Sequence, residues 1–163
     1  MDILEFAINM EIEGEKFYDD LAKKNKDNSI SIVMQMLAKD EKEHANILRN
    51  RKLNMPEDQQ KNNSTLTEAE SIFKKAKSFK DIVKQTPDQL DTYRLALEKE
   101  QQSIDLYQRL LLKTPDDKVK QIFEFLINQE KEHYKIIEEL VLMLKHAEDW
   151  VEDAEFGLRT EEY

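Results

Sequence analysis

The sequence predicts an all-α fold: a four-helix bundle with a long crossover between its second and third helices and a short C-terminal extension. The first observation behind this prediction is that only 2 of 163 residues are Gly and 3 are Pro, so the turns that strands need are scarce. The second is that apolar side chains recur at helical spacing in four long stretches. We expect residues 1–147 to form the bundle and residues 148–163 to form the extension.

The four long helices are predicted from apolar residues at positions i, i+3, i+4 and i+7, which face a common core. In chain order these stripes cover residues 4–22, 30–48, 93–110 and 119–144. Thr114 precedes a Pro that suits a first helical position, so we expect this Thr to cap the fourth helix. Thr86 and Pro87 predict the same start for the third helix.

The segment between the two helical pairs predicts how the chain crosses the bundle. Residues 50–64 are polar and indicate a loop, whereas residues 66–83 return to a weak helical pattern that predicts one or two short helices across the bundle. Helices of ~25 residues are ~37 Å long. A link of this size can therefore return the chain along the whole bundle, the connectivity of ferritin-like folds.

Charge and cysteine content exclude several classes of function. A net charge of −10 argues against nucleic acid and against an anionic membrane surface as partners. The absence of Cys excludes disulfides, iron–sulfur clusters and thiol chemistry in this sequence. With no signal-like N-terminus and no run of eighteen apolar residues, the expected location is the cytoplasm.

An internal repeat relates the two helical pairs at a constant offset of 89 residues. It carries the segment 41–44 (EKEH) onto 130–133 (EKEH) without a gap. Each apolar stripe is interrupted at its centre by residues of the types that bind metals, and a Glu and a His three apart lie on one helical face. The interrupting residues are Glu11, Glu41, His44, Glu100, Glu130 and His133.

Four carboxylates in one core need compensation. A buried carboxylate without a partner costs several kcal/mol, against a whole-domain stability of about 5–15 kcal/mol. No Lys or Arg occupies the inward positions, so relief comes from protons, water or cations. Two divalent cations would balance four glutamates, and oxygen ligands with two imidazoles suit iron or manganese, with zinc as a possible substitute. We therefore expect a dinuclear metal site, the ligand set of di-iron carboxylate proteins.

Two tyrosines belong to the same pattern. Tyr18 and Tyr107 lie seven residues beyond Glu11 and Glu100, about 10 Å along each helix. Each could hydrogen-bond a ligand carboxylate on a neighbouring helix and orient it. The alternative is that both are core tyrosines whose hydroxyls bond to any nearby acceptor.

The chain resembles the rubrerythrin-type ferritin-like proteins over nearly its whole length. The segments that carry the resemblance are 7–18 (AINMEIEGEKFY), 40–45 (DEKEHA), 96–107 (ALEKEQQSIDLY), 129–134 (QEKEHY) and 150–163 (WVEDAEFGLRTEEY). The resemblance implies that the six interrupting residues bind two iron ions.

Two features depart from the family pattern. Full rubrerythrins carry a rubredoxin-like module with four Cys, and this sequence has none. They also carry an extra glutamate one turn beyond the third-helix ligand. The corresponding residue here is Ser103, and its repeat mate is Gly14. These small residues either leave room for oxygen or peroxide beside the metals or only permit close packing of the helices.

The resemblance implies an oxidoreductase that reduces hydrogen peroxide or dioxygen with electrons from an external donor such as a rubredoxin-like protein. Iron sequestration or ferroxidation is the alternative function, and a metal-free bundle that acts as an interaction module is a third. The tail after His146 has Trp150, Phe156 and Tyr163 among charges and is too short to fold alone. We expect it to pack on its own bundle or on a second subunit of a homodimer.

Overall fold

The computed structural model describes the backbone of residues 2–53, 63–75 and 89–159, and the side chains of these residues except 147, 148 and 150–159. Within these ranges the chain forms five helices and no strand, which confirms the all-α prediction. The helices are α1 (Ile3–Lys24), α2 (Ile30–Lys52), α3 (Thr65–Lys75), α5 (Gln89–Lys113) and α6 (Asp117–Arg159).

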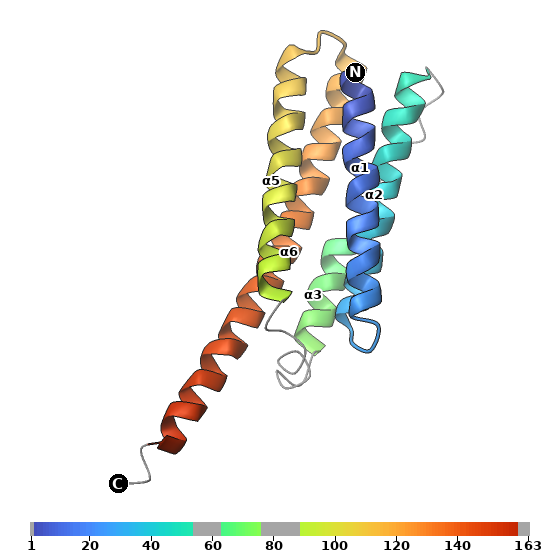
Figure 1. The fold of residues 1–163 in the computed structure, drawn as a ribbon. Coiled ribbons are helices and arrows are strands. Elements are labelled where there is room, and N and C mark those ends of the chain that lie inside the picture. Colours follow the sequence, from blue (N-terminus) through green and yellow to red (C-terminus); the bar gives the residue numbers. More distant parts are fainter. Residues whose placement is uncertain (1, 54–62, 76–88, 160–163) are drawn as a thin grey trace.

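Four of these helices form the ferritin-like bundle. α1 pairs with α2, α5 pairs with α6, and α2 also contacts α6. Figure 1 shows that α2 ends near the N-terminal end of the bundle, whereas α5 begins at the opposite end. The chain between them therefore runs the length of the bundle, as the long crossover requires.

The crossover contributes one described helix to the bundle. α3 packs against α2 and α6 and buries Ala69 completely. It begins at Thr65, and a hydrogen bond between Ser64 and Glu68 closes its first turn. The rest of the segment for which one or two short helices were predicted, residues 76–83, lies outside the described residues.

One predicted helix cap is wrong. α6 begins at Asp117, and the side chain of Asp116 accepts a hydrogen bond of 2.9 Å from the backbone N–H of Lys118. Thr114 instead donates a hydrogen bond of 2.7 Å to the carbonyl of Leu110 at the end of α5. An Asp carboxylate two residues from the first free N–H is a strong cap, so the helix starts after Asp116. The predicted cap at Thr86 lies outside the described residues.

The apolar core is divided into two parts. One contains Tyr18, Leu21, Leu37 and Leu140, and the other contains Ala7, Leu48, Tyr107 and Leu126. Along α1, the second part ends at Ile8 and the first begins at Tyr18. The centre of the bundle, between the two apolar parts, is therefore where Glu11 and its neighbours lie.

The C-terminal extension begins as a continuation of the fourth bundle helix. The backbone of α6 is helical without a break to Arg159, and Figure 1 shows it projecting beyond the end of the bundle. The predicted packing of residues 148–163 on the bundle or on a second subunit stays a prediction. In the part of the chain described, no helix is long and apolar enough to cross a membrane.

Candidate metal centre

All six predicted ligand residues meet at the centre of the bundle. α1 and α5 contribute one glutamate each, and α2 and α6 contribute one glutamate and one histidine each. At most 4% of the surface of any of them is exposed. The six are Glu11, Glu41, His44, Glu100, Glu130 and His133.

The six residues form two groups of four, and within each group the ligand atoms lie within 4.8 Å of one another. Glu41 and Glu130 belong to both groups. The first group, which we call the His44 half, adds Glu11 and His44. The second, the His133 half, adds Glu100 and His133. Each half therefore offers three carboxylates and one imidazole, and two carboxylates lie between the halves.

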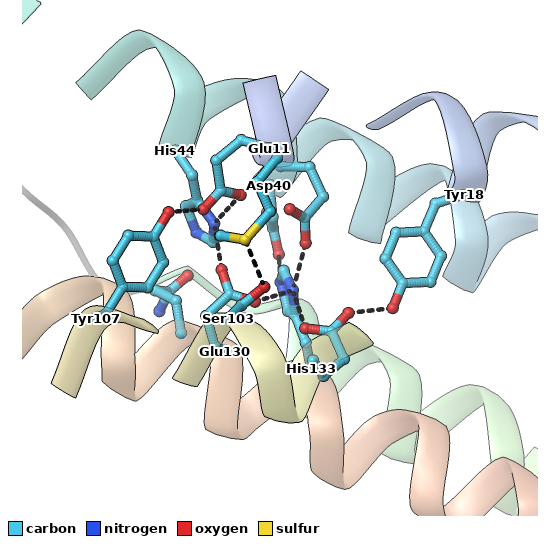
Figure 2. A network of polar contacts seen from close by, with 12 residues as sticks. Glu11, Tyr18, Asp40, His44, Ser103, Tyr107, Glu130 and His133 are labelled. Atoms are coloured by element: carbon cyan, nitrogen blue, oxygen red, sulfur yellow. Dashed lines mark hydrogen bonds and ion pairs between the residues drawn. The ribbon is translucent and has the colours of Figure 1, made fainter. Parts of the chain in front are cut away.

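Both histidines direct the same ring nitrogen inward (Figure 2). His44 Nδ1 lies 2.9 Å from Glu130 Oε1 and 3.4 Å from Glu11 Oε2. His133 Nδ1 lies 2.9 Å from Glu41 Oε1 and 3.7 Å from Glu100 Oε2. The two rings stack with centroids 5.4 Å apart and planes 20° apart. Residues that the 89-residue repeat relates, such as His44 and His133, therefore take equivalent positions in the two halves.

The two tyrosines connect the helical pairs across the centre. Tyr18 of α1 donates a hydrogen bond to Glu100 of α5, and Tyr107 of α5 donates one to Glu11 of α1 (Figure 2). Burial and the nearby carboxylates raise the pKa of both hydroxyls well above its usual range. Both tyrosines therefore stay protonated and remain donors. Their part in orienting ligands stays a prediction.

Without a cation, the surroundings of the two shared carboxylates favour their protonated forms. Burial, followed by the charges of neighbouring glutamates, raises the pKa of Glu41 and of Glu130 well above its usual range. Burial acts in the same direction on Glu11 and Glu100. The neighbouring Glu41 nevertheless holds the pKa of Glu11 below its usual value, and His133 does the same for Glu100. Burial would lower the pKa of His133, yet its acidic neighbours raise it well above the usual value.

The donor set fits metal ions. Five buried ligand atoms make no hydrogen bond among the described residues, although four of them lie within ion-pair distance of an oppositely charged group: His44 Nδ1 and Nε2, Glu100 Oε2, and both carboxylate oxygens of Glu130. Within the described ranges, the ion pairs of the four glutamates involve only histidine and no Lys or Arg. Unpartnered oxygen and imidazole nitrogen atoms in a dry site are what a divalent cation would satisfy.

Comparison with known proteins decides the family. A family model of rubrerythrin matches residues 2–141. The chain belongs to the rubrerythrin family. All six predicted ligand residues lie within the rubrerythrin match, and so do Tyr18 and Tyr107.

A solved structure shares the fold. A hypothetical protein from Pyrococcus furiosus superimposes with a TM-score of 0.65 at 22% sequence identity, over 88% of this chain and 89% of that one. No protein with a curated description matches significantly. The rubrerythrin assignment therefore depends on the family model and agrees with the fold.

One residue of this rubrerythrin centre was missed by the sequence analysis. Asp40 is buried, and its Oδ2 lies 3.1 Å from His133 Nε2, the ring nitrogen that faces away from the glutamates. Burial would raise the pKa of Asp40, but the hydrogen bond with His133 and the His133 charge hold it below its usual value. The signal in the sequence is its position four residues before His44, on the same helical face.

Gly14 of α1 lies directly against the Glu41 carboxylate. A Cβ atom at this position would lie 2.8 Å from Glu41 Oε2. The missing side chain therefore gives the shared carboxylate its room in this rubrerythrin-family protein.

A cleft of 530 Å³ leads to the ligands between α1 and α5. Apolar side chains such as Met10, Phe17 and Leu106 line it, and Glu41 and Glu100 border it from the bundle interior. Both small residues singled out in the sequence, Gly14 and Ser103, lie along it, and Ser103 donates hydrogen bonds to the Lys99 carbonyl and to the Met10 sulfur. The cleft therefore brings a small molecule next to Glu41 and Glu100 of the candidate centre.

Proposed function

We propose that this protein is a di-iron oxidoreductase that reduces hydrogen peroxide, or dioxygen, with electrons from an external donor. The observation that carries the proposal is the buried cluster whose two halves share Glu41 and Glu130. Three carboxylates and one imidazole in each half suit iron or manganese better than copper. Membership of the rubrerythrin family favours iron.

In the proposed centre each half of the cluster holds one iron. Glu11 and His44 would hold one iron, Glu100 and His133 would hold the other, and Glu41 and Glu130 lie within reach of both. Two Fe(II) ions supply the two electrons that, with two protons, convert one hydrogen peroxide to two waters.

The residues around the ligands keep this set in place. Tyr18 and Tyr107 hold Glu100 and Glu11 through hydrogen bonds from the opposite helical pair. Partners of this kind orient ligands and tune the metal. The two apolar parts of the core exclude water from the ends of the cluster, so the oxidant is expected to enter from the side.

The cleft between α1 and α5 is the proposed route for the oxidant. It borders Glu41 and Glu100, one shared ligand and one ligand of the His133 half. Because Gly14 and Ser103 are small, a molecule the size of peroxide can approach both carboxylates without moving a bulky side chain. The electrons come from elsewhere, since the sequence has no Cys to hold a rubredoxin-type iron. A rubredoxin-like protein is the proposed donor.

Stopped-flow mixing tests the proposal. The chain is loaded with two equivalents of Fe(II) without oxygen and mixed with peroxide or with dioxygen. We expect peroxide to oxidise both ions rapidly, with one peroxide consumed per two Fe(II). A Glu41→Ala variant, which lacks a shared ligand, is expected to lose the fast phase.

The opposite result supports iron storage. Oxidation that is fast only with dioxygen, with more than two irons retained per chain, would contradict peroxide reduction. Protein purified with iron available that binds none would contradict the metal centre itself and leave the bundle as an interaction module.

A further inference from the structure

The two halves of the centre have equal ligand sets but unequal surroundings. The 89-residue repeat places Asp40 and Gln129 at equivalent positions, each one residue before a shared glutamate and four before a histidine. Both side chains are buried. Asp40 carries a negative charge, whereas Gln129 is a neutral amide. The repeat therefore allows the effect of a carboxylate and of an amide to be compared at equivalent positions.

Only one histidine has a described partner on its outer nitrogen. His133 Nε2 lies 3.1 Å from Asp40 Oδ2, whereas His44 Nε2 has no hydrogen-bond partner among the residues that the structure describes. The equivalent Gln129 is engaged elsewhere, because its Oε1 accepts a hydrogen bond of 2.8 Å from Asn63. The two halves therefore have equivalent ligands, but within the described ranges only His133 has a carboxylate behind its ring.

Asp40 is itself held in place. Thr65, the first residue of α3, acts on its carboxylate and helps to hold the pKa of Asp40 below its usual value. The crossover segment thus touches both repeat-equivalent positions, through Asn63 at Gln129 and through Thr65 at Asp40. Of these two positions, only Asp40 contacts a histidine of the centre, His133.

The bond to Asp40 has a definite chemical consequence. A proton held on Nε2 by the carboxylate leaves Nδ1, which faces Glu41 and Glu100, as the nitrogen of His133 that a metal would bind. A carboxylate behind a histidine also makes the ring a stronger base toward a metal and holds its orientation. His44 presents Nδ1 to Glu130 and Glu11 without such support.

We propose that Asp40 is a positioning residue that makes the His133 half the tighter cation site, filled before the His44 half. The proposal depends on the proposed function only in that the cluster binds two cations. It assigns them an order: the first ion binds Glu41, Glu100, Glu130 and His133, and the second completes the centre with Glu11 and His44.

Titration of the full-length, metal-free chain with Co(II) in the absence of oxygen tests the order. Bound metal is measured by equilibrium dialysis, and the ligand field by the visible bands of Co(II). We expect two steps. Glu100→Ala should remove the tighter step and Glu11→Ala the weaker one, which assigns each step to its half.

The decisive variants are Asp40→Asn and Asp40→Ala. Partners behind metal-bound histidines typically contribute 10–100-fold to metal affinity. We expect the tighter step to weaken by about that factor, more for Ala than for Asn, with shifted Co(II) bands. Gln129→Asn, at the equivalent buried position, should leave the affinity and bands of the tighter step unchanged. Equal helical content of the metal-free variants, by circular dichroism, shows that the chain still folds.

Several results would overturn the inference. These are a single step that fills both halves equally, Asp40 variants with unchanged affinity, weakening confined to the step that Glu11→Ala removes, or no Co(II) binding at all. Failure of the proposed function looks different: ordered binding with an intact Asp40 effect, but no consumption of peroxide by the iron-loaded chain.

Discussion

Glu41 is a ligand residue of both halves of the centre and also packs against α1. It belongs to both groups of ligands, lies 2.9 Å from His133 Nδ1, and lies against Gly14 of α1. Burial and the charge of Glu130 raise its pKa, so its carboxylate depends on its surroundings more than an exposed one would. A change beside it is therefore a sensitive test of the site.

Gly14→Ala is expected to separate folding from metal binding. Ala is better than Gly inside a helix by roughly 0.5–1 kcal/mol, so the metal-free protein should keep or gain thermal stability. The new Cβ would displace the Glu41 carboxylate, because it would lie 2.8 Å from Oε2. We expect metal affinity to fall by about 10-fold, the scale of changes just outside a metal's ligands.

The matched control is Ser103→Ala, at the repeat-equivalent position. Ser103 bonds to the Lys99 carbonyl and the Met10 sulfur rather than to a ligand, so metal affinity should stay unchanged. Unaltered metal binding by Gly14→Ala would show that Glu41 does not need this space.

For single residues, the sequence predicted that the six ligand residues come together, because a Glu or His in phase with an apolar stripe is expected to be buried. Asp40 could not be paired with His133 in the same way. Its partner is on α6, and the repeat alone does not say which helices lie close enough for an outer nitrogen to reach a carboxylate. Gln129 at the equivalent position made the pairing harder to foresee.

The bundle helices bury the acidic residues of the centre. Without cations, the charges of these residues affect the stability of the folded protein. Glu41, Glu130 and His133 all have a pKa raised by folding. For such groups the folded state binds protons more tightly than the unfolded chain, so their contribution to stability is full at low pH and is lost as pH rises.

Metal-free protein should therefore lose stability as pH rises, from above the unfolded Glu value of about 4.3 and, for His133, from above about 6.5. Each such group contributes at most about 1.4 kcal/mol per pH unit. Glu11 and Glu100 act in the opposite sense, but only as pH falls below about 4.3.

Thermal unfolding followed by circular dichroism, from pH 6 to 9, measures this effect. A chelated sample should melt at progressively lower temperature, whereas a sample with bound divalent metal should change much less because cations replace the protons. A chelated sample whose melting temperature rises over this range would contradict the assigned protonation.

The helices themselves could be predicted well because their stripes are long and regular. Their ends were harder to place. Thr114 and Asp116 are both good capping residues flanking one Pro, and the cap fell to Asp116, which also forms an ion pair of 2.7 Å with Arg51 at the end of α2. That tertiary contact is not visible in local sequence.

At the scale of the whole molecule, the length of α6 requires explanation. With 43 residues it is ~64 Å long, against ~37 Å for the 25 residues of α5, and Figure 1 shows its end beyond the bundle. Most helical stability comes from packing rather than from propensity. A second subunit that covers this end would supply the packing.

We accordingly predict a homodimer that depends on residues 148–163. Mass in solution, measured by light scattering after size exclusion, should give a dimer for the full chain and a monomer for residues 1–147. Retained helical content and metal binding would show that the shorter chain is intact. A dimer that survives the deletion, or a monomeric full chain, would exclude the tail as the cause.

The crossover was predictable because the link is too long for a short turn and helix lengths set the distance to be crossed. The contacts at the start of α3 were not, since its pattern is weak. Asn63, just before α3, hydrogen-bonds to Gln129 of α6, and Thr65 acts on Asp40 of α2.

The most direct test of the account is the number of irons bound per chain after anaerobic loading and removal of free metal. The full chain should hold two. Glu11→Ala and Glu100→Ala should each hold about one, and Glu41→Ala and Glu130→Ala should hold the fewest, because those carboxylates belong to both halves. A full chain that holds no iron, or four variants that all still hold two, would contradict a centre built from these six side chains.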